Sequence, residues 1–265
     1  MTVTPSSTTS SRSVRLNCDM GESLGPWRMG CDEDVMPLVD MANIACGFHA
    51  SDPVTMDRTL RLARRHSVVI GAHPAYPDLT GFGRRSMRCS REEIVAMIRY
   101  QVGALSGLAE AQSLSVNYVK PHGALYNDMM RDPDILRAVL DAVAGCKPSL
   151  ALMVLATPDQ EPIRRLAEAV NVPLLFEAFA DRAYDERGFL VSRQEPNAVY
   201  QDPQRILEQA LRLAEDGVVV TRSGDPLRLS PDTLCVHGDN AESVNAVRAI
   251  REALGSRQSV APPPA

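Results

Sequence analysis

Short apolar segments recur along this chain, and each is separated from the next by a stretch with the spacing of an amphipathic helix. The segments are rich in Val, Ile, Leu and Ala and carry few charges, as in strands that are buried on both faces. We expect seven such strands, at Val14–Asp19, Met41–Cys46, Val68–Ala72, Val116–Lys120, Leu150–Leu155, Pro173–Glu177 and Thr233–His237. Strands that alternate with helices predict a parallel sheet with right-handed crossovers.

Residues that favour helix starts precede several of the helical stretches. Asp52, Asp132 and Asp202 are each followed by proline, which is favoured in the first helical turn. The segments Ser90–Glu93 and Thr157–Gln160 have the spacing of a capping box. We therefore expect a helix to begin at each of these places.

A parallel sheet of this kind either stays open or closes into a barrel. No expected strand is followed by a G-x-G-x-x-G or G-x-x-x-x-G-K-[ST] turn, which removes the commonest reasons for an open nucleotide-binding sheet. Polar groups instead follow nearly every strand, and in a barrel all of them would face one mouth. These groups are Asp19, His49, His73, Lys120 with His122, Glu177 with Asp181 and Arg182, and His237 with Asp239. We predict a single α/β domain, a seven-stranded (β/α) barrel, over residues 14–255.

Composition limits the partners and the compartment. The chain has 265 residues and a net charge of −5, which argues against binding to nucleic acid or to an anionic membrane surface. It contains no run of eighteen apolar residues, so no membrane span is expected. Its six cysteines form no C-x-x-C pair, which favours reduced thiols and a cytoplasmic location. Residues 1–13, rich in Ser and Thr, and residues 256–265, rich in Pro, are expected to be disordered tails.

Four of the five histidines, His49, His73, His122 and His237, come just after a predicted strand. A single histidine is more often structural than catalytic, but four at the same end of four strands indicate a shared site. With the nearby carboxylates, such a site supports general acid–base hydrolysis, with or without a metal ion. The carboxylates are Asp19, Glu22, Asp181 and Asp239.

Three arginines near the strand ends suit an anionic substrate group. Arg84, Arg85 and Arg182 could bind a carboxylate or a phosphate, because guanidinium groups bind both in a bidentate manner. For Arg182 the alternative is a salt bridge to a neighbouring aspartate. The loop after Val68–Ala72 could likewise be a rigid surface loop, and the cysteines within strands are expected to be buried and inert.

Several motifs together resemble the LamB/YcsF family, from about Leu16 to the last predicted helix. They are Asn17-x-Asp-x-Gly-Glu22, Ala42-Asn-Ile-Ala-Cys-Gly-Phe-His49, Ile70-Gly-Ala-His-Pro74, Gly81-Phe-Gly-Arg-Arg85, Lys120-Pro-His-Gly-Ala-Leu-Tyr-Asn127, Phe179-Ala-Asp-Arg182 and Cys235-Val-His-Gly-Asp239. Two small departures from the family pattern lie beside polar positions: Cys18, Met20 and Ser23 in and after the first motif, and Ser51 after His49.

The resemblance implies a seven-stranded barrel related to the glycoside hydrolase/deacetylase superfamily. It also implies ATP-dependent hydrolytic opening of 5-oxo-L-proline to L-glutamate, together with partner subunits B and C of a 5-oxoprolinase. With the strand-end positions, it makes catalytic candidates of Asp19, Glu22, His49, His73, Lys120, His122, Asp181 and His237. The candidates for substrate binding are Asn43, Arg84, Arg85, Tyr126, Arg182 and Asp239.

Several alternatives stay open at this point. ATP, the expected co-substrate, could bind this chain through an unfamiliar loop, or subunits B and C could phosphorylate the lactam and pass it on. A divalent metal is compatible with the residues but is not required by them. Two rival functions are a metal-dependent deacetylase-like hydrolase of polysaccharides or amides, and a non-catalytic lactam-binding subunit.

Overall fold

The computed structural model describes residues 14–238 and 240–255. The predicted tails, residues 1–13 and 256–265, and the candidate Asp239 lie outside the described residues. Among the described residues, none of the helices combines the length and the apolar character needed to cross a membrane.

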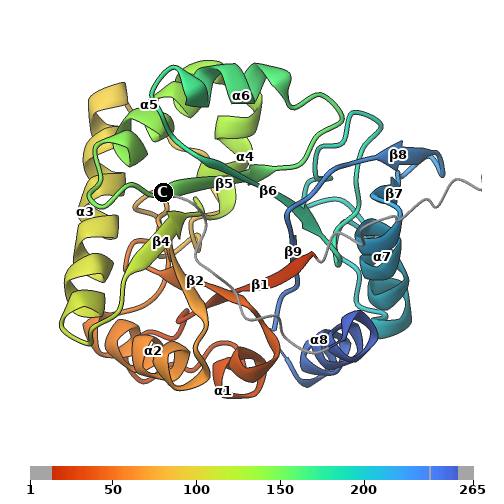
Figure 1. Ribbon diagram of the computed structural model, residues 1–265, viewed down its shortest axis with the longest axis horizontal. Helices are drawn as coiled ribbons and strands as arrows, with labels where there is room; N and C mark the ends of the chain where they lie inside the picture. Colours follow the sequence, from red (N-terminus) through yellow and green to blue (C-terminus); the bar gives the residue numbers. More distant parts are fainter. Residues whose placement is uncertain (1–13, 239, 256–265) are drawn as a thin grey trace, which may run out of the picture.

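Seven parallel strands close into a barrel in the order β1-β2-β3-β4-β5-β6-β9. Figure 1 shows this barrel at the centre with the helices around it. The strands are β1 (Arg15–Met20), β2 (Met41–Ala45), β3 (Val69–His73), β4 (Val116–Val119), β5 (Ala151–Leu155), β6 (Leu174–Phe179) and β9 (Thr233–Cys235). Two further strands, β7 (Val218–Val220) and β8 (Pro226–Arg228), form an antiparallel hairpin outside it. The predicted fold class, with seven strands, is confirmed.

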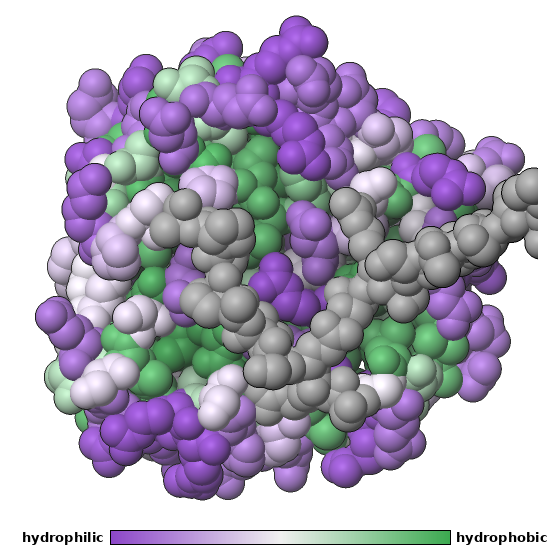
Figure 2. All heavy atoms as spheres, viewed as in Figure 1, coloured by the Kyte–Doolittle hydropathy of each residue, from purple (hydrophilic) through white to green (hydrophobic). Residues whose placement is uncertain are grey.

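Helices connect the strands around the outside of the barrel (Figure 1). They are α1 (Asp32–Val35), the 3-10 helix η1 (Met36–Leu38), α2 (Pro53–His66), α3 (Arg91–Glu110), α4 (Gly123–Arg131), α5 (Pro133–Ala144), α6 (Glu161–Glu168), α7 (Pro203–Glu215) and α8 (Ala241–Leu254). Figure 2 shows hydrophilic side chains around the periphery of this face and hydrophobic ones nearer to the strands. The helices thus cover the apolar outer face of the barrel.

Most predicted helix starts are confirmed, and one is wrong. Asp52, Asp132 and Asp202 accept hydrogen bonds from backbone N–H groups of the first turn, and Ser90 forms the complete capping box. The expected box at Thr157–Gln160 does not form, because the Thr157 hydroxyl donates to the carbonyl oxygen of Asp159 instead. Helix α6 consequently starts at Glu161, and α4 is a helix for which no prediction was made.

Side chains alternate along each strand between the helices and the barrel interior, as the two-residue period of a strand requires. Outward residues such as Leu16, Ile44 and Val154 belong to the large core shared with the helices. A separate small core fills one level of the interior and consists of Met41, Tyr118, Ala151, Met153 and Leu175. On β2, β4 and β6, the inward positions two residues further along become polar. The site described below therefore stands on an apolar layer.

Gly71 makes room for the largest side chain of this inner layer. A Cβ atom at Gly71 would lie 2.1 Å from the Tyr118 ring, which is fully buried. The Tyr118 hydroxyl donates to Asn43 Oδ1 at 2.6 Å, so the ring is fixed at both ends. The absence of a side chain at Gly71 is thus a packing requirement of the barrel.

We predict that Gly71→Ala lowers the free energy of unfolding by about 1–3 kcal/mol, the usual cost of overpacking a core. Urea denaturation followed by circular dichroism measures this loss. Gly103→Ala is the matched control, because Gly103 lies in α3 and a Cβ atom added there would have open space around it. This change should be neutral or stabilising by up to about 1 kcal/mol. Equal stability of Gly71→Ala and the wild type would contradict the packing argument.

Candidate active site

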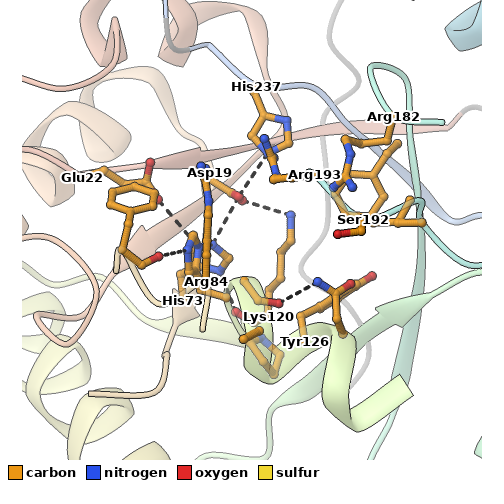
Figure 3. Close-up of a pocket in the computed structure, with 18 of the residues that line it drawn as sticks. Asp19, Glu22, His73, Arg84, Lys120, Tyr126, Arg182, Ser192, Arg193 and His237 are labelled. Atoms are coloured by element: carbon orange, nitrogen blue, oxygen red, sulfur yellow. Dashed lines mark hydrogen bonds and ion pairs between the residues drawn. The ribbon is translucent and has the colours of Figure 1, made fainter. Parts of the chain in front are cut away.

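A cavity of about 880 Å³ opens at the end of the barrel where the parallel strands terminate. It is lined by residues that follow β1, β3, β4, β6 and β9, so segments far apart in the sequence meet there. Figure 3 shows the side chains that converge on it. The predicted residues among its lining are Asp19, Glu22, His73, Arg84, Lys120, His122, Tyr126, Arg182 and His237.

A buried ammonium group lies at the centre of the site. Lys120 Nζ is 3.0 Å from Asp19 Oδ1 and 2.8 Å from Glu177 Oε1. Burial alone would lower the pKa of Lys120, but Asp19, Cys235 and Glu177 together raise it well above its usual value. Burial would likewise raise the pKa of Asp19, yet His73, Lys120 and His237 hold it well below the usual range. Lys120 is therefore cationic and Asp19 anionic at neutral pH.

Hydrogen bonds from residues buried beneath the cavity fix the Asp19 carboxylate. Asn43 Nδ2 donates to Asp19 Oδ1 at 2.7 Å and to Asn17 Oδ1 at 2.8 Å. Asn17 in turn donates to the Thr233 hydroxyl at 2.9 Å. Asn43 is fully buried beneath the cavity and does not line it. The structure thus gives Asn43 a position from which it orients Asp19, in place of the direct substrate contact expected of it.

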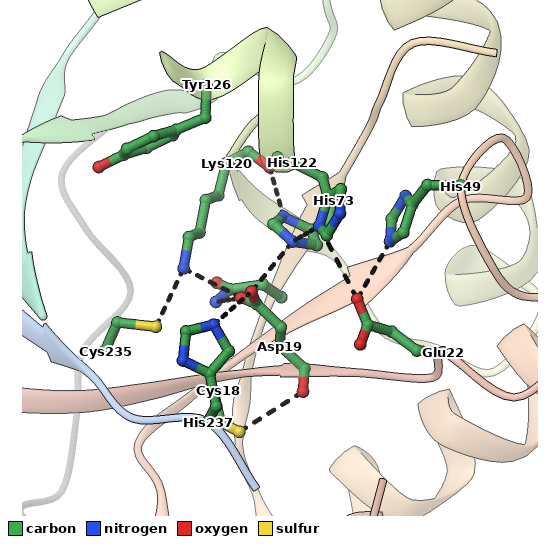
Figure 4. Close-up of polar contacts among 12 residues, drawn as sticks. Cys18, Asp19, Glu22, His49, His73, Lys120, His122, Tyr126, Cys235 and His237 are labelled. Carbon is green, nitrogen blue, oxygen red and sulfur yellow. Dashed lines mark hydrogen bonds and ion pairs between the residues drawn. The ribbon is translucent and has the colours of Figure 1, made fainter. Parts of the chain in front are cut away.

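On one side of Asp19, Glu22 and three histidines gather (Figure 4). Glu22 Oε1 is 3.2 Å from His49 Nε2, and His73 Nε2 is 2.9 Å from His122 Nδ1. The His49 and His122 rings stack with centroids 3.7 Å apart. Burial, above all, lowers the pKa of both stacked rings, and His122 is shifted the further. His49 and His122 are therefore neutral at neutral pH.

A second carboxylate orients His237. Asp181 Oδ2 is 2.6 Å from His237 Nδ1, and His237 Nε2 is 3.7 Å from Asp19 Oδ2. Burial would lower the pKa of His237, but Asp181 and Asp19 raise it above its ordinary value of 6.5. The ring therefore presents Nε2 to the cavity as a group able to give or take a proton near neutral pH. Asp181 itself stands behind the ring and does not line the cavity.

Positive charge gathers on the arginine side of the cavity, formed by Arg182 and Arg193 (Figure 3), where Arg193 Nη2 also lies 3.3 Å from His237 Nε2. Arg182 donates to the backbone carbonyl oxygens of Val191 and Ala198, at 2.6 and 3.2 Å, and is nearly fully buried. The expected alternative, a salt bridge to a neighbouring aspartate, is not the contact that fixes it. Burial, followed by the charge of Arg193, lowers the pKa of Arg182 to about 10. Arg182 remains charged at neutral pH.

Arg84 and Arg85, which were expected to act together, point to different places. Arg84 lines the cavity and lies over the Phe82 ring, 4.8 Å from its centroid. Arg85 pairs with Asp78 and also donates to the Thr80 hydroxyl, away from the cavity lining. Arg85 therefore holds its own loop in shape.

Four residues of the site were missed or undervalued from the sequence: Asn17, Cys235, Glu177 and Arg193. Asn17 and Cys235 lie two residues before Asp19 and His237, so the period of a strand would have placed them on the same inward face. Cys235 was expected to be inert. Its Sγ lies 3.3 Å from Lys120 Nζ, although burial keeps its pKa well above the usual thiol value. The sequence around Arg193 does not indicate a place in the site. Arg193 reaches the mouth of the barrel only through the path of the long segment after β6.

Two groups of side chains place ligand-type atoms close enough to share a metal ion. One consists of Glu22, His49, His73 and His122, and the other of Asp19, Cys235 and His237. The ammonium group of Lys120 lies 3.0 Å from Asp19 and 3.3 Å from Cys235, so its positive charge opposes a cation in the second group. The first group has no lysine or arginine among its ion pairs in the described part of the chain.

The barrel is closed and has seven strands, and ionised and neutral acid–base groups lie at its mouth. These features define the class of the protein as an α/β-barrel hydrolase. The sequence matches the LamB/YcsF family over residues 14–264, and the chain belongs to that family. Its similarity to individual relatives extends over nearly the full length of both chains.

Among the relatives, a Chromohalobacter salexigens protein named as the A subunit of 5-oxoprolinase is 60% identical, over 90% of this chain and 96% of its own. A Pseudomonas putida protein, named as the second A subunit of 5-oxoprolinase, is 59% identical, over 90% and 93%. The crystal structure of a lactam utilization protein from Thermus thermophilus superimposes with a TM-score of 0.83 at 41% identity, covering 91% of this chain and 96% of that one.

The His237–Asp181 pair generates a prediction about stability and pH. The folded-state pKa of His237 lies above 6.5, so the charged ring stabilises the fold at low pH, and this contribution is lost as pH rises through the folded-state pKa. Asp181→Asn removes the main cause of the raised pKa, and burial should then lower the pKa of His237. We expect the melting-temperature difference between wild type and variant to shrink between pH 6 and pH 9. A difference that stays constant over this range would contradict the pairing.

Proposed function

We propose that this chain catalyses the hydrolytic opening of 5-oxo-L-proline to L-glutamate as the A subunit of an ATP-dependent 5-oxoprolinase, with subunits B and C. The observation that carries the proposal is one cavity with an arginine side, Arg182 and Arg193, that touches an acid–base side, because Arg193 Nη2 lies 3.3 Å from His237 Nε2. A lactam that bears a carboxylate needs both. The names of the relatives, which refer to 5-oxoprolinase and to lactam utilization, support the same substrate class.

The substrate's carboxylate belongs on the arginine side. Arg182 has its Nε and one Nη group occupied by backbone carbonyls, which fixes the plane of its guanidinium at the cavity wall. Arg193, from the same segment, lines the cavity as well. Guanidinium groups bind carboxylates with directional, charge-assisted hydrogen bonds. Such binding leaves the lactam ring between the arginines and Asp19.

The lactam carbonyl then faces Lys120 and Asp19. Amide resonance makes this carbonyl a poor electrophile, and phosphorylation of its oxygen by ATP would make the carbon reactive. Asp19 stays ionised and accepts a proton from the attacking water, directly or through a neighbouring imidazole. Lys120 offsets the negative charge of the phosphoryl group on the former carbonyl oxygen, while the electron pair released by water attack moves to the ring nitrogen. Because no phosphate-binding glycine loop follows any strand, we assign the phosphorylation step to subunits B and C.

His237 completes the reaction. As the C–N bond breaks, the ring nitrogen needs a proton to leave as an amine. His237 Nε2 faces the cavity 3.3 Å from Arg193 Nη2, and Asp181 holds its Nδ1, so the protonated ring can donate once the substrate carboxylate draws Arg193 to itself. The opposite pKa shifts of Asp19 and His237 divide base from acid at neutral pH. The phosphoryl group stays on the new carboxyl as an acyl phosphate, and a second water molecule hydrolyses it to give glutamate and inorganic phosphate.

The proposal is tested by glutamate release and by 5-oxoproline-dependent ATP hydrolysis, measured with and without subunits B and C. We expect turnover only when all three are present. ATP-coupled turnover by this chain alone would contradict the assignment of phosphorylation to the partners. Deacetylation of sugar or amide substrates without any lactam turnover would favour the deacetylase alternative.

We predict that Asp19→Asn lowers glutamate release by roughly 10²- to 10⁴-fold, the usual effect of removing a general base. The amide keeps the size of the side chain and Glu177 still pairs with Lys120, so the variant should stay folded, although loss of one buried carboxylate lowers its melting temperature. If Asp19 only ties its loop, the variant instead keeps most of its turnover. Retention of more than about a tenth of wild-type turnover would transfer the role of base to His122 or Glu22.

We predict that Arg193→Ala raises the KM for 5-oxoproline about 10- to 100-fold, as expected for the loss of a charged hydrogen bond, with a smaller effect on kcat. The effect should vanish with 2-pyrrolidinone, which has the lactam ring and lacks the carboxylate. Arg187→Ala is the matched control, since Arg187 is exposed on the same segment, near Asp185. An equal effect on both substrates would show that Arg193 does not bind the carboxylate.

A further inference from the structure

Four side chains from different parts of the barrel mouth point their ligand-type atoms at one small volume. Glu22 comes from the loop after β1, His49 from the loop after β2, His73 from the end of β3, and His122 from the segment after β4. Figure 4 shows the four side chains close together. All four donor atoms lie within 4.8 Å of one another, and the three histidines are buried.

In two of the rings, the nitrogen that faces away from the cluster forms a hydrogen bond. This bond determines which nitrogen carries the proton and which one points into the cluster without it. His73 Nδ1 is 2.7 Å from the carbonyl oxygen of Lys120, and His122 Nε2 is 2.9 Å from that of Phe82. A carbonyl oxygen only accepts, so each of these nitrogens carries the proton. In the neutral rings, His73 Nε2 and His122 Nδ1 then both offer lone pairs, 2.9 Å apart. Two acceptors at this distance repel each other unless a cation lies beside them.

We propose that Glu22, His49, His73 and His122 bind a divalent transition-metal ion through Glu22 Oε1, His49 Nε2, His73 Nε2 and His122 Nδ1. Zinc takes tetrahedral nitrogen and oxygen ligands at about 2.0–2.1 Å, which places neighbouring donor atoms about 3.3 Å apart. The contacts of 2.9, 3.2 and 3.8 Å among these donors bracket that spacing. Backbone carbonyls that hold the outer ring nitrogens are the usual support of metal-binding histidines.

An extra proton on His73 is the competing explanation. His73 Nε2 lies 3.2 Å from Asp19 Oδ2, so a charged ring could donate to Asp19 or to His122. A proton accounts for that one contact. It does not account for Glu22 Oε1, which lies 3.2 and 3.8 Å from two further ring nitrogens. A metal ion accounts for all of these contacts with one charge.

The site adjoins the proposed catalytic groups but does not depend on the substrate. His73 links it to Asp19, and Glu22 and His122 line the same cavity. A bound dication would supply a Lewis acid at the wall of that cavity. Metal binding is measured without any substrate, so its failure and a failure of the proposed function are distinguishable.

The experiment uses the full chain without an affinity tag, stripped with EDTA and dialysed. Zn²⁺ binding is measured by isothermal titration calorimetry and elemental analysis, and Co²⁺ binding by its visible absorption. We expect about one ion per chain, a higher melting temperature with Zn²⁺, and a Co²⁺ spectrum of nitrogen and oxygen ligands. Glu22→Gln should weaken binding by at least the roughly 10- to 100-fold typical of losing a supporting residue.

His66→Ala is the matched control, because His66 ends helix α2 away from the cavity lining and its loss should leave Zn²⁺ binding unchanged. His49→Asn is a second ligand variant, and circular dichroism verifies that each variant is folded. Absence of stoichiometric Zn²⁺ and Co²⁺ in the wild type would overturn the proposal and assign the inner contact to a proton on His73. Identical Zn²⁺ affinities of wild type and a folded Glu22→Gln would overturn it too.

Discussion

The buried ammonium group of Lys120 is the constraint around which the mouth of the barrel is arranged. Moving a charge from water into a protein interior costs several kcal/mol unless opposite charges and hydrogen bonds compensate. Asp19 and Glu177 supply two carboxylates, and Tyr126 donates to Glu177 Oε2 at 3.1 Å. The carboxylates are thus held in place by the same contacts that stabilise the lysine. Orientation of Asp19 is a consequence of folding, and does not have to be gained when the substrate binds.

The strand period explains how one barrel carries both an apolar plug and a charged site. Inward positions come every second residue, so Met41 and Asn43 share a face, as do Tyr118 and Lys120. Gly71 permits the Tyr118 ring to fill the lower layer, and the hydroxyl of that ring reaches up to Asn43. The polar layer above thus satisfies the buried hydroxyl group of Tyr118.

Much of the fold followed from the sequence, because strands and caps are local. The seven strands, their closure and most helix starts depend on hydrophobic period and on residues such as Ser90. The site was predicted as a set of strand-end residues, and Asp19, Lys120 and His237 do line one cavity. Long-range placement was not predictable: nothing local distinguishes Arg85, paired with Asp78, from Arg193, which reaches the mouth. Helix α4 was likewise not predicted, because its segment contains residues that also favour turns.

The two sides of the cavity differ in charge, and Asp19 interacts with groups on both. The histidine side is buried and mostly neutral, and the arginine side is cationic. Asp19 lies between them, 3.2 Å from His73 and 3.7 Å from His237. Positive groups around Asp19 keep it ionised, while Asp19 and Asp181 keep a proton on His237 to higher pH. Asp19 and His237 contribute to each other's pKa shifts, while His73 and Lys120 act most strongly on Asp19, and Asp181 acts most strongly on His237. The proposed base and acid are thus prepared together before any substrate arrives, Asp19 on β1 and His237 just after the neighbouring strand β9.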